Sequence, residues 1–241
     1  MTAVLQIARR ELGSFLNSWW GWVILALILL FDGLAFNVYA VGFTPKYSSD
    51  VLEAFFEAST VTVMIGGVLL AMPTIARERS AGTLALLQTA PIEESQVIAG
   101  KFLGAFGFLT VIKALTIYMP MLIEVNGKVS WGHIGAGYLG LFALGAAVVA
   151  IGVFASAVSR NQLLAAVLGG SIVGFFILCW LVSRLSEPPL KGVFAYMALF
   201  DKHFQPFMRG RINTESLVYY GSLAFGFLLL ATRALKARRW Q

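Results

Sequence analysis

Cysteine is almost absent from this chain. Cys179 is the only one in 241 residues, so no disulfide can form within the chain, and cysteine usage does not indicate a redox compartment. Histidine is nearly as scarce, and neither His133 nor His203 has a Cys, His or Glu partner at metal-ligand spacing. We therefore expect no metal site, and Cys179 is most simply a small packing residue.

Charge is the second scarcity. Asp, Glu, Lys and Arg make up 12% of the residues, whereas a soluble domain carries about a quarter. Hydrophobic residues reach 59% and the mean hydropathy is +0.80, which together indicate an integral membrane protein. The net charge of +6 suits juxtamembrane cations facing anionic headgroups. No basic run with interleaved aromatics supports a nucleic-acid partner.

A phosphate-binding loop is also missing. That loop needs Gly-Lys followed by Ser or Thr, so that backbone N–H groups surround the phosphates. Gly100–Lys101 is followed by Phe102, and Gly127–Lys128 by Val129. We expect no catalytic residue and no cofactor on this chain, since no cluster of His, Asp, Glu or Cys lies at membrane depth.

What the chain has in abundance is long apolar runs, each continuous and about as long as a bilayer-crossing helix. We predict six spans: Trp19–Val41, Ala58–Ala76, Phe102–Ile123, Ile134–Ala157, Leu163–Ser183 and Glu215–Thr232. The first is too long and too rich in Trp for a cleaved signal, so we expect it to be retained. The fold class is therefore an all-α membrane protein with a single six-span domain.

Lys and Arg are distributed unevenly about these spans. With both termini cytoplasmic, ten lie on the inner side and seven on the outer side, and five of the seven lie in the segment 184–214. Without that segment the ratio is ten to two, which predicts cytoplasmic termini.

An amphipathic helix is expected over residues 3–18, before the first span. Its apolar stripe, at three- and four-residue spacing, is Val4, Ala8, Leu12, Phe15, Leu16 and Trp19. A helix of this kind lies in the headgroup region with its charged residues, such as Arg9 and Arg10, toward water.

Small residues recur at steps of four in two spans. They include Gly132, Ala136 and Gly140 in the fourth span, and Ala166, Gly170 and Gly174 in the fifth. Such spacing allows close helix packing in lipid. Packing within one bundle and a seam between two copies both explain it.

Two ionisable residues fall inside spans. Asp32 and Lys113 lie about 13 and about 11 residues from the inner ends of their spans, roughly 17–20 Å deep. An unpaired charge there is costly, so we predict an Asp32–Lys113 ion pair. The alternative is a snorkelling Lys113 and an Asp32 that lines a wet cavity.

The segment 184–214 is too long for a turn and too rich in Phe, Tyr, Met and Leu for a disordered linker. We predict a short helix from "LKGVFAYMALF" that dips into the outer leaflet and ends at Pro206, with a plain surface loop as the alternative.

The segment 77–101, between the second and third spans, is the most unusual. Glu78 and Arg79 follow the span, Gly82 and Thr83 predict a turn and an N-cap, and "LALLQTA" predicts a short helix before Pro91. The exposed leucines are Leu84, Leu86 and Leu87. Docking to a soluble partner and anchoring on the membrane surface explain them equally well.

The segment "ARERSAGTLALLQTAPIEESQVIAGKFLG" closely resembles the signature of ABC-2 type permeases, the membrane subunits of one class of ATP-binding cassette exporters. Its matching positions are Glu78, Arg79, Gly82, Thr83, Leu84, Leu86, Leu87, Pro91, Gly100 and Lys101. The tail from "HFQPFMRGRINTES" onward resembles the GldF/NosY group, permeases of gliding-motility and copper-maturation gene clusters. The resemblance covers essentially the whole chain.

The resemblance implies a half-transporter of a bacterial inner membrane. A second permease copy or paralogue and a separate cassette ATPase dimer, which binds ATP and Mg, would be its partners, with accessory proteins and lipids. Residues Thr83–Ala90 would form the coupling helix, and Glu78 would pair with Arg9 or Arg10 of the connecting helix. The outer segment near Lys191–Met208 would be a re-entrant element. From the residues alone, an ATP-independent secondary transporter or a membrane scaffold stays open.

Overall fold

The computed structural model describes residues 3–40, 47–83, 92–123 and 128–237. These residues form helices and contain no strand. The helices are α1 (Ala3–Leu16), α2 (Trp19–Ala40), α3 (Ser48–Ala71), α4 (Pro73–Ser80), α6 (Glu94–Leu115), α7 (Tyr118–Ile123), α8 (Trp131–Val158), α9 (Gln162–Leu185), α10 (Leu190–Met197), α11 (Asp201–Met208) and α12 (Thr214–Ala237). The predicted all-α fold is confirmed, and six segments are long and apolar enough to cross a membrane: α2, α3 with α4, α6 with α7, α8, α9 and α12.

Helix α8 lies at the centre of the bundle and packs against α3, α6, α9, α11 and α12. Its glycines provide the room for these contacts. A Cβ on Gly137 would lie 2.2 Å from the Phe56 ring, and one on Gly140 would lie 2.6 Å from Phe207 Cβ. Ala136, Gly137 and Gly140 of the fourth span therefore pack within the bundle, whereas Gly132 is exposed. On α9, by contrast, a Cβ on Gly170 or Gly174 would meet no described atom within 4 Å.

Two spans that were predicted as continuous are broken, and each break lies close to a proline. Helix α3 gives way to α4 at Pro73, and α6 ends three residues before the start of α7, which contains Pro120. Proline lacks the N–H of the helical hydrogen bond, and its ring crowds the carbonyl four residues earlier. The second span also starts at Ser48 rather than Ala58. Its polar first turn stays largely exposed, and Leu52, Phe55 and Phe56 just after it are buried.

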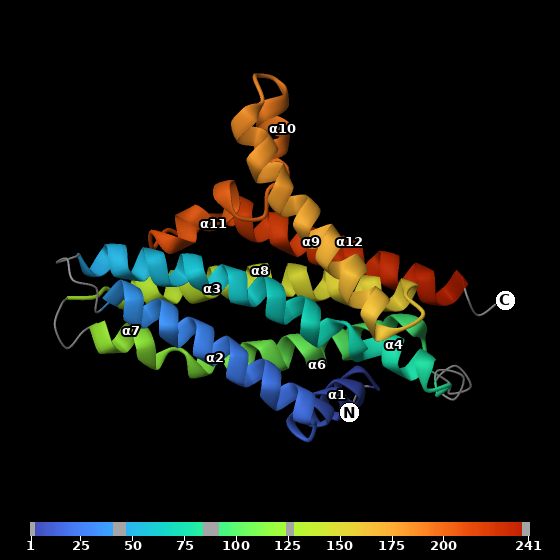
Figure 1. Cartoon of the computed structure of the whole chain (residues 1–241). Helices are drawn as coiled ribbons and strands as arrows, with labels where there is room; N and C mark the ends of the chain where they lie inside the picture. The colour runs from blue at the N-terminus through green and yellow to red at the C-terminus, as the bar shows by residue number, and fades with distance from the viewer. Residues whose placement is uncertain (1–2, 41–46, 84–91, 124–127, 238–241) are drawn as a thin grey trace.

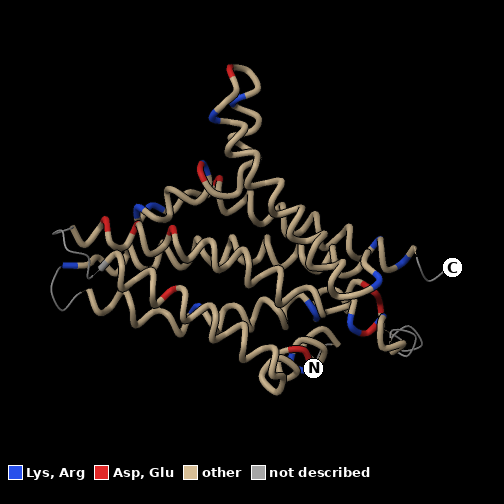
Figure 2. Tube along the Cα trace, viewed as in Figure 1, with Lys and Arg blue, Asp and Glu red and all other residues tan. Residues whose placement is uncertain are grey.

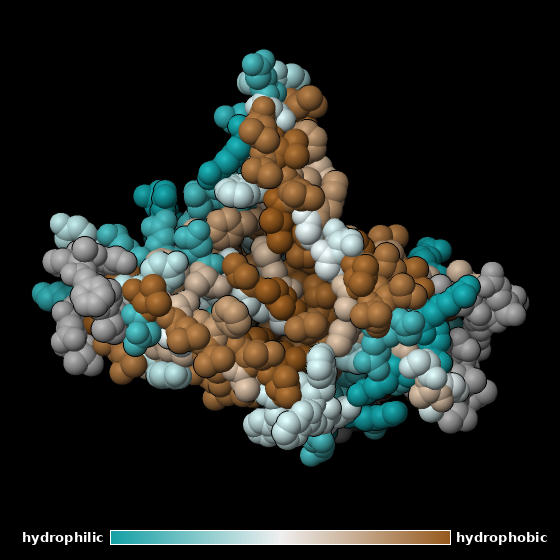
Figure 3. Space-filling model, in the orientation of Figure 1, coloured by the Kyte–Doolittle hydropathy of each residue, from teal (hydrophilic) through white to brown (hydrophobic). Residues whose placement is uncertain are grey.

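The spans are joined to one another at two opposite ends of the bundle (Figure 1). We call the end that carries α1, α4, the α8–α9 junction and the C-terminus the α1 end, and the opposite one the α11 end. Lys, Arg, Asp and Glu gather toward both ends, with few between them (Figure 2). Hydrophobic side chains cover the middle of the visible face (Figure 3), as expected for a surface in contact with lipid.

Helices α9 and α10 pack against each other and leave the bundle as a hairpin at the top of Figure 1. The short helix predicted from "LKGVFAYMALF" is present as α10, but its predicted end at Pro206 is wrong. Helix α10 ends at Met197, and Pro206 lies inside the separate helix α11. Ala198 is buried with extended φ and ψ of −65° and 130°, which turns the chain between the two helices.

Candidate functional site

A buried lysine joins three helices at the α1 end. Lys101 of α6 is 1% exposed. Its Nζ lies 2.9 Å from Glu78 Oε1 of α4 and 3.4 Å from Glu11 Oε2 of α1, and it also donates a hydrogen bond to the Thr74 carbonyl. Buried charges are stable only when paired and hydrogen-bonded. Lys101 therefore holds α1, α4 and α6 together.

The expected pairing of Glu78 with Arg9 or Arg10 is wrong. Both arginines are on the exposed face of α1. Successive residues are about 100° apart around a helix, and Glu11, next to Arg10, is the one that points into the protein. Glu11 Oε1 and Glu78 Oε2 are buried and have no hydrogen-bond partner among the described residues.

Helix α1 packs on α6, although Leu16 and Trp19 of the predicted apolar stripe are exposed. A Cβ on Gly100 would lie 2.7 Å from Ile7, and one on Gly104 would lie 2.5 Å from Glu11 Cβ and 3.0 Å from the Ala8 carbonyl oxygen. Only glycine at these positions of α6 allows α1 to approach this closely. The close packing brings the Glu11 carboxylate within reach of Lys101.

Arg79 connects α4 to the end of α8. Its guanidinium donates hydrogen bonds to the carbonyls of Ala157, at 2.8 Å, and Ser159. The last carbonyls of a helix lack partners within the helix, and a cation there also interacts favourably with the helix dipole. Arg79 thus stabilises the C-terminal end of α8 and fixes α4 to it.

Ser156 of α8 compensates for the break at Pro73. Its Oγ accepts hydrogen bonds from the backbone N–H groups of Ile75 (3.0 Å) and Ala76 (2.9 Å), and donates one to the Met72 carbonyl (2.8 Å). The first N–H groups of a helix have no partner within the helix. One hydroxyl therefore satisfies the groups that the break between α3 and α4 leaves free.

Helix α4 ends at a left-handed glycine. Gly82 has φ of +72°, its N–H bonds the Arg79 carbonyl, and the Thr83 N–H bonds the Glu78 carbonyl. This is the Schellman arrangement that ends many helices. The Thr83 hydroxyl donates to the same Glu78 carbonyl, so Thr83 closes α4. The predicted helix that it would begin, with Leu84, Leu86, Leu87 and Pro91, lies outside the described residues.

A second polar cluster lies inside the bundle, where the sequence predicts the Asp32–Lys113 pair. Lys113 Nζ lies 2.7 Å from Asp32 Oδ2, and the two residues are 1% and 0% exposed. Thr62 donates to Asp32 Oδ1 (2.8 Å) and accepts from Lys113 Nζ (2.7 Å), and Ser59 Oγ donates to Asp32 Oδ1 (3.3 Å). Every atom of the pair thus has a partner from α2, α3 or α6, so Lys113 does not snorkel.

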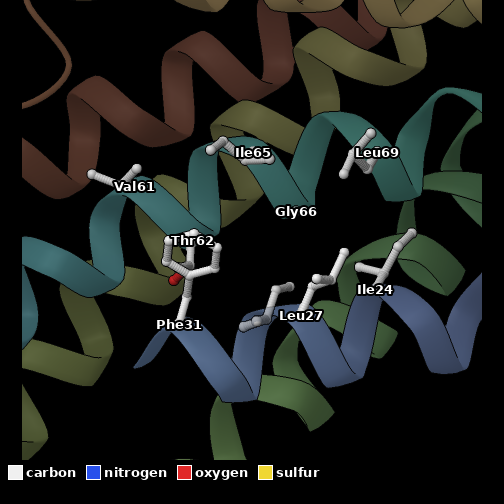
Figure 4. A pocket seen from close by; sticks show the side chains of 9 residues that line it. Ile24, Leu27, Phe31, Val61, Thr62, Ile65, Gly66 and Leu69 are labelled. Atoms are coloured by element: carbon white, nitrogen blue, oxygen red, sulfur yellow. The ribbon is translucent and has the colours of Figure 1, made fainter. Parts of the chain in front are cut away.

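An apolar groove of about 130 Å³ runs along the outside of α2 and α3, beside this cluster (Figure 4). Thr62 is its one residue with a polar side chain, and that hydroxyl is engaged by Asp32 and Lys113. Gly66 gives the two helices room, because a Cβ there would lie 2.5 Å from Ile28 Cδ1. The groove suits an alkyl chain.

Sequence reasoning missed three residues of these clusters. Glu11 lies within an apolar stripe, Ser156 in an apolar helix and Thr62 in the middle of a span. For Ser156 the available signal was Pro73, because a proline-broken span needs hydrogen-bond partners from a neighbouring helix. For Thr62 it was the predicted ion pair, whose remaining donors and acceptors need partners.

The architecture defines a multi-pass membrane protein. At its α1 end, Lys101 with Glu11, Glu78 and Thr74, which we call the Lys101 joint, connects the two helices that flank residues 84–91. The family model of the ABC-2 family transporter protein matches residues 5–219, so the chain belongs to the ABC-2 transporter family.

Two curated relatives share a name. The probable ABC transporter permease protein NosY of Pseudomonas aeruginosa is 30% identical over 152 residues, which are 56% of this chain and 52% of that protein. The probable ABC transporter permease protein NosY of Stutzerimonas stutzeri is 33% identical over 112 residues, 43% of this chain and 39% of that protein. The matches thus span about half the length of these relatives or less.

Proposed function

We propose that this chain is the permease subunit of an ATP-driven exporter, and that it couples ATP hydrolysis by a cassette ATPase on another chain to the movement of cargo or to mechanical transmission across the membrane. The observation that supports the proposal is the buried Lys101 joint. It lies where α4 and α6 flank the segment 84–91, the part that resembles a coupling helix.

Through the Lys101 joint, the segment 84–91 is connected to three helices, α1, α4 and α6. On one side, Thr83 is hydrogen-bonded to Glu78, which is paired with Lys101. On the other side, α6 begins at Glu94 and carries Lys101 two turns further on. A force on the segment therefore acts on α4 and α6 directly, and on α1 through Glu11.

A rigid connection of this kind transmits movement better than a flexible loop does. Arg79 and Ser156 extend it to α8, the central helix, through hydrogen bonds to backbone groups. Breaking any of these bonds would leave a buried polar group without a partner. An ATPase that docks on the segment would thus act on the bundle core, and the α1 end would face the cytoplasm of a bacterial inner membrane.

A second copy of the permease is part of the proposal. Helix α9 leaves many large apolar side chains exposed, among them Leu163, Val167, Phe175 and Leu178. Gly170 and Gly174 lie on the same helix with open space beside them. Small residues on an exposed membrane helix favour close helix association. Two permeases with one ATPase dimer would complete the transporter.

Co-purification with a cassette ATPase of the same organism tests the proposal. We expect the triple variant Leu84→Glu, Leu86→Glu, Leu87→Glu to insert normally and to lose at least nine-tenths of the bound ATPase. Leu5→Glu is the control, since it charges an exposed leucine of α1 at the same end of the bundle and away from the α9 face, and it should keep the ATPase. A triple variant that still binds the ATPase would refute the docking role of the segment. If the wild-type chain itself bound no such ATPase, an ATP-independent transporter or a scaffold would be the better assignment.

A further inference from the structure

The α11 end carries a concave basic surface that the proposed function does not use. A pocket of about 540 Å³ lies between α11 and the chain that follows it. The side chains with polar atoms that line it are Asp201, Lys202, Gln205, Arg209, Arg211 and Asn213. Three cations and one carboxylate therefore surround a cavity on the side predicted to face away from the cytoplasm.

The pocket is formed by the way α11 ends. Gly210 has φ of +73°, its N–H bonds the Phe207 carbonyl, and the Arg211 N–H bonds the Pro206 carbonyl at 2.8 Å. This Schellman turn reverses the chain, so Arg211 and the residues after it line the same pocket as the polar face of α11. A hydrogen bond from the His133 ring to the Met208 carbonyl fixes the turn to α8.

Helix α11 has two distinct faces. His203, Phe204, Phe207 and Met208 are buried against the protein. Lys202, Gln205 and Arg209 lie on the other face and line the pocket. The buried face sets the orientation of the helix, so the positions of the cations follow from packing.

The side chains of Lys202, Arg209 and Arg211 have N–H donors available for an anion. Arg209 Nε pairs with Glu53 at 3.2 Å, and Lys202 Nζ pairs with Glu215 at 3.1 Å. The side chains of both pairs are more than a third exposed, and exposed ion pairs of this kind are weak because water screens them. The Arg211 guanidinium has no hydrogen bond or ion pair within the part of the chain that the structure describes. An entering anion therefore meets one unpaired guanidinium and two weakly held cations.

This surface also accounts for an anomaly in the sequence. Five of the seven Lys and Arg residues predicted outside lie in the segment 184–214, against the tendency of cations to stay on the cytoplasmic side. Lys202, Arg209 and Arg211 are three of those five. Cations on the outer side disfavour the predicted orientation of the chain, and binding of an anion would explain why they are present there.

We propose that this pocket binds a phosphate group, in contact with Arg211, Arg209 and Lys202. Arginine forks fit the geometry of phosphate oxygens, and charge-assisted hydrogen bonds are the strong ones. The phosphate belongs either to the headgroup of an anionic phospholipid or to a soluble anion. Both sources present the same chemistry to the pocket.

Native mass spectrometry of the full chain, released from mixed micelles, tests the site. The first arm offers phosphatidylglycerol, the second phosphatidylcholine, and the third adds inorganic phosphate as a competitor. We expect the triple variant Lys202→Gln, Arg209→Gln, Arg211→Gln to retain at least threefold less phosphatidylglycerol than the wild-type chain. Displacement by millimolar phosphate would identify a soluble anion as a second source, and resistance to it would identify the headgroup.

The matched control is the triple variant Lys128→Gln, Arg184→Gln, Lys191→Gln. It removes the same charge from the predicted outer side but leaves the pocket intact. Equal lipid retention by the pocket variant and the wild-type chain would overturn the proposal, and so would an equal loss in the control. If the triple pocket variant does not fold, Arg211→Gln alone decides, because its guanidinium has no described partner to lose.

Discussion

Lys101 Nζ lies 2.9 Å from Glu78 Oε1, across the gap between the helices that flank the segment 84–91. Both side chains are largely buried, so the pair is shielded from water and salt. Glu11 adds a third charge from α1, 3.4 Å from the same ammonium. The two ion pairs of Lys101 thus connect α1, α4 and α6 at the α1 end.

Loss of the lysine should destabilise the protein strongly. Lys101→Met leaves the carboxylates of Glu11 and Glu78 buried without a cation, which costs about 3–5 kcal/mol. Thermal unfolding can be followed with a thiol-reactive dye, since Cys179 is the only cysteine and is buried. The triple variant Lys101→Met, Glu11→Gln, Glu78→Gln should recover most of the lost stability. An unfolding temperature of the single variant equal to that of the wild-type chain would contradict the pairing.

Removal of the Ser156 hydroxyl should destabilise the protein at the break between α3 and α4. In Ser156→Ala the N–H groups of Ile75 and Ala76 lose their acceptor, at a cost of about 1–3 kcal/mol. Ser222→Ala is the control, because that exposed hydroxyl bonds only the Tyr219 carbonyl within its own helix. The dye-based unfolding temperature should fall in the first variant and stay within error in the second. Equal behaviour of both variants would show that Ser156 has no special role.

The intramembrane ion pair predicts rescue by a double replacement. Asp32→Leu leaves the Lys113 charge unpaired, and Lys113→Leu leaves that of Asp32, so each should lower stability by about 3–5 kcal/mol. The double variant Asp32→Leu, Lys113→Leu should be far more stable than either single variant, since no charge then remains. If the two single losses simply add in the double variant, the residues do not act as a pair.

His203 should make the α11 end sensitive to acid. Its ring stacks on Tyr219 with 3.9 Å between centroids and hydrogen-bonds the Tyr196 carbonyl at 2.9 Å. Burial lowers the pKa of His203 below its ordinary value, and the nearby Lys202 lowers it further, while the hydrogen bond to the Tyr196 carbonyl and the charge of Glu215 oppose the shift. The folded state thus favours the neutral ring. Its contribution to stability is complete above the unfolded pKa of about 6.5 and is lost as the pH falls below it.

The measurement is the unfolding temperature between pH 7.5 and pH 5. We expect it to fall more for the wild-type chain than for His203→Gln, whose amide keeps a donor for the Tyr196 carbonyl. Ser222→Ala removes no titratable group and is the control, so it should keep the acid dependence of the wild-type chain. The same dependence in His203→Gln and in the wild-type chain would exclude His203 as its source.

Hydropathy was sufficient to predict the spans, because a helix crosses the bilayer when about 20 consecutive residues are predominantly apolar. The depth of Asp32 and Lys113 followed from residue counts, and two charges at equal depth have few alternatives to pairing. These predictions use only the position of a residue along its helix. They do not require knowledge of how the helices are rotated about their axes.

The contacts that join the helices could not be predicted in the same way. Whether Glu11 or Arg10 points toward Lys101 and Glu78 depends on a rotation of about 100°, which the packing of α1 on Gly100 and Gly104 sets. Ser156 meets Ile75 and Ala76 only because α4 lies against α8, far away in the sequence. The break at Pro73 was visible in the sequence, but the residue that satisfies it was not.

The most direct test of the Lys101 joint is a labelling experiment on the permease bound to its cassette ATPase. With Cys179 replaced by Ser and a single cysteine at Leu27 in the groove between α2 and α3, the thiol labelling rate is measured with and without ATP. We predict a nucleotide-dependent change in this rate for the otherwise wild-type complex. The same complex with the stability-restoring triple variant Lys101→Met, Glu11→Gln, Glu78→Gln should still hold the ATPase but show no such change. A change of equal size in both complexes would contradict the claim that Lys101 transmits movement from the ATPase to the spans.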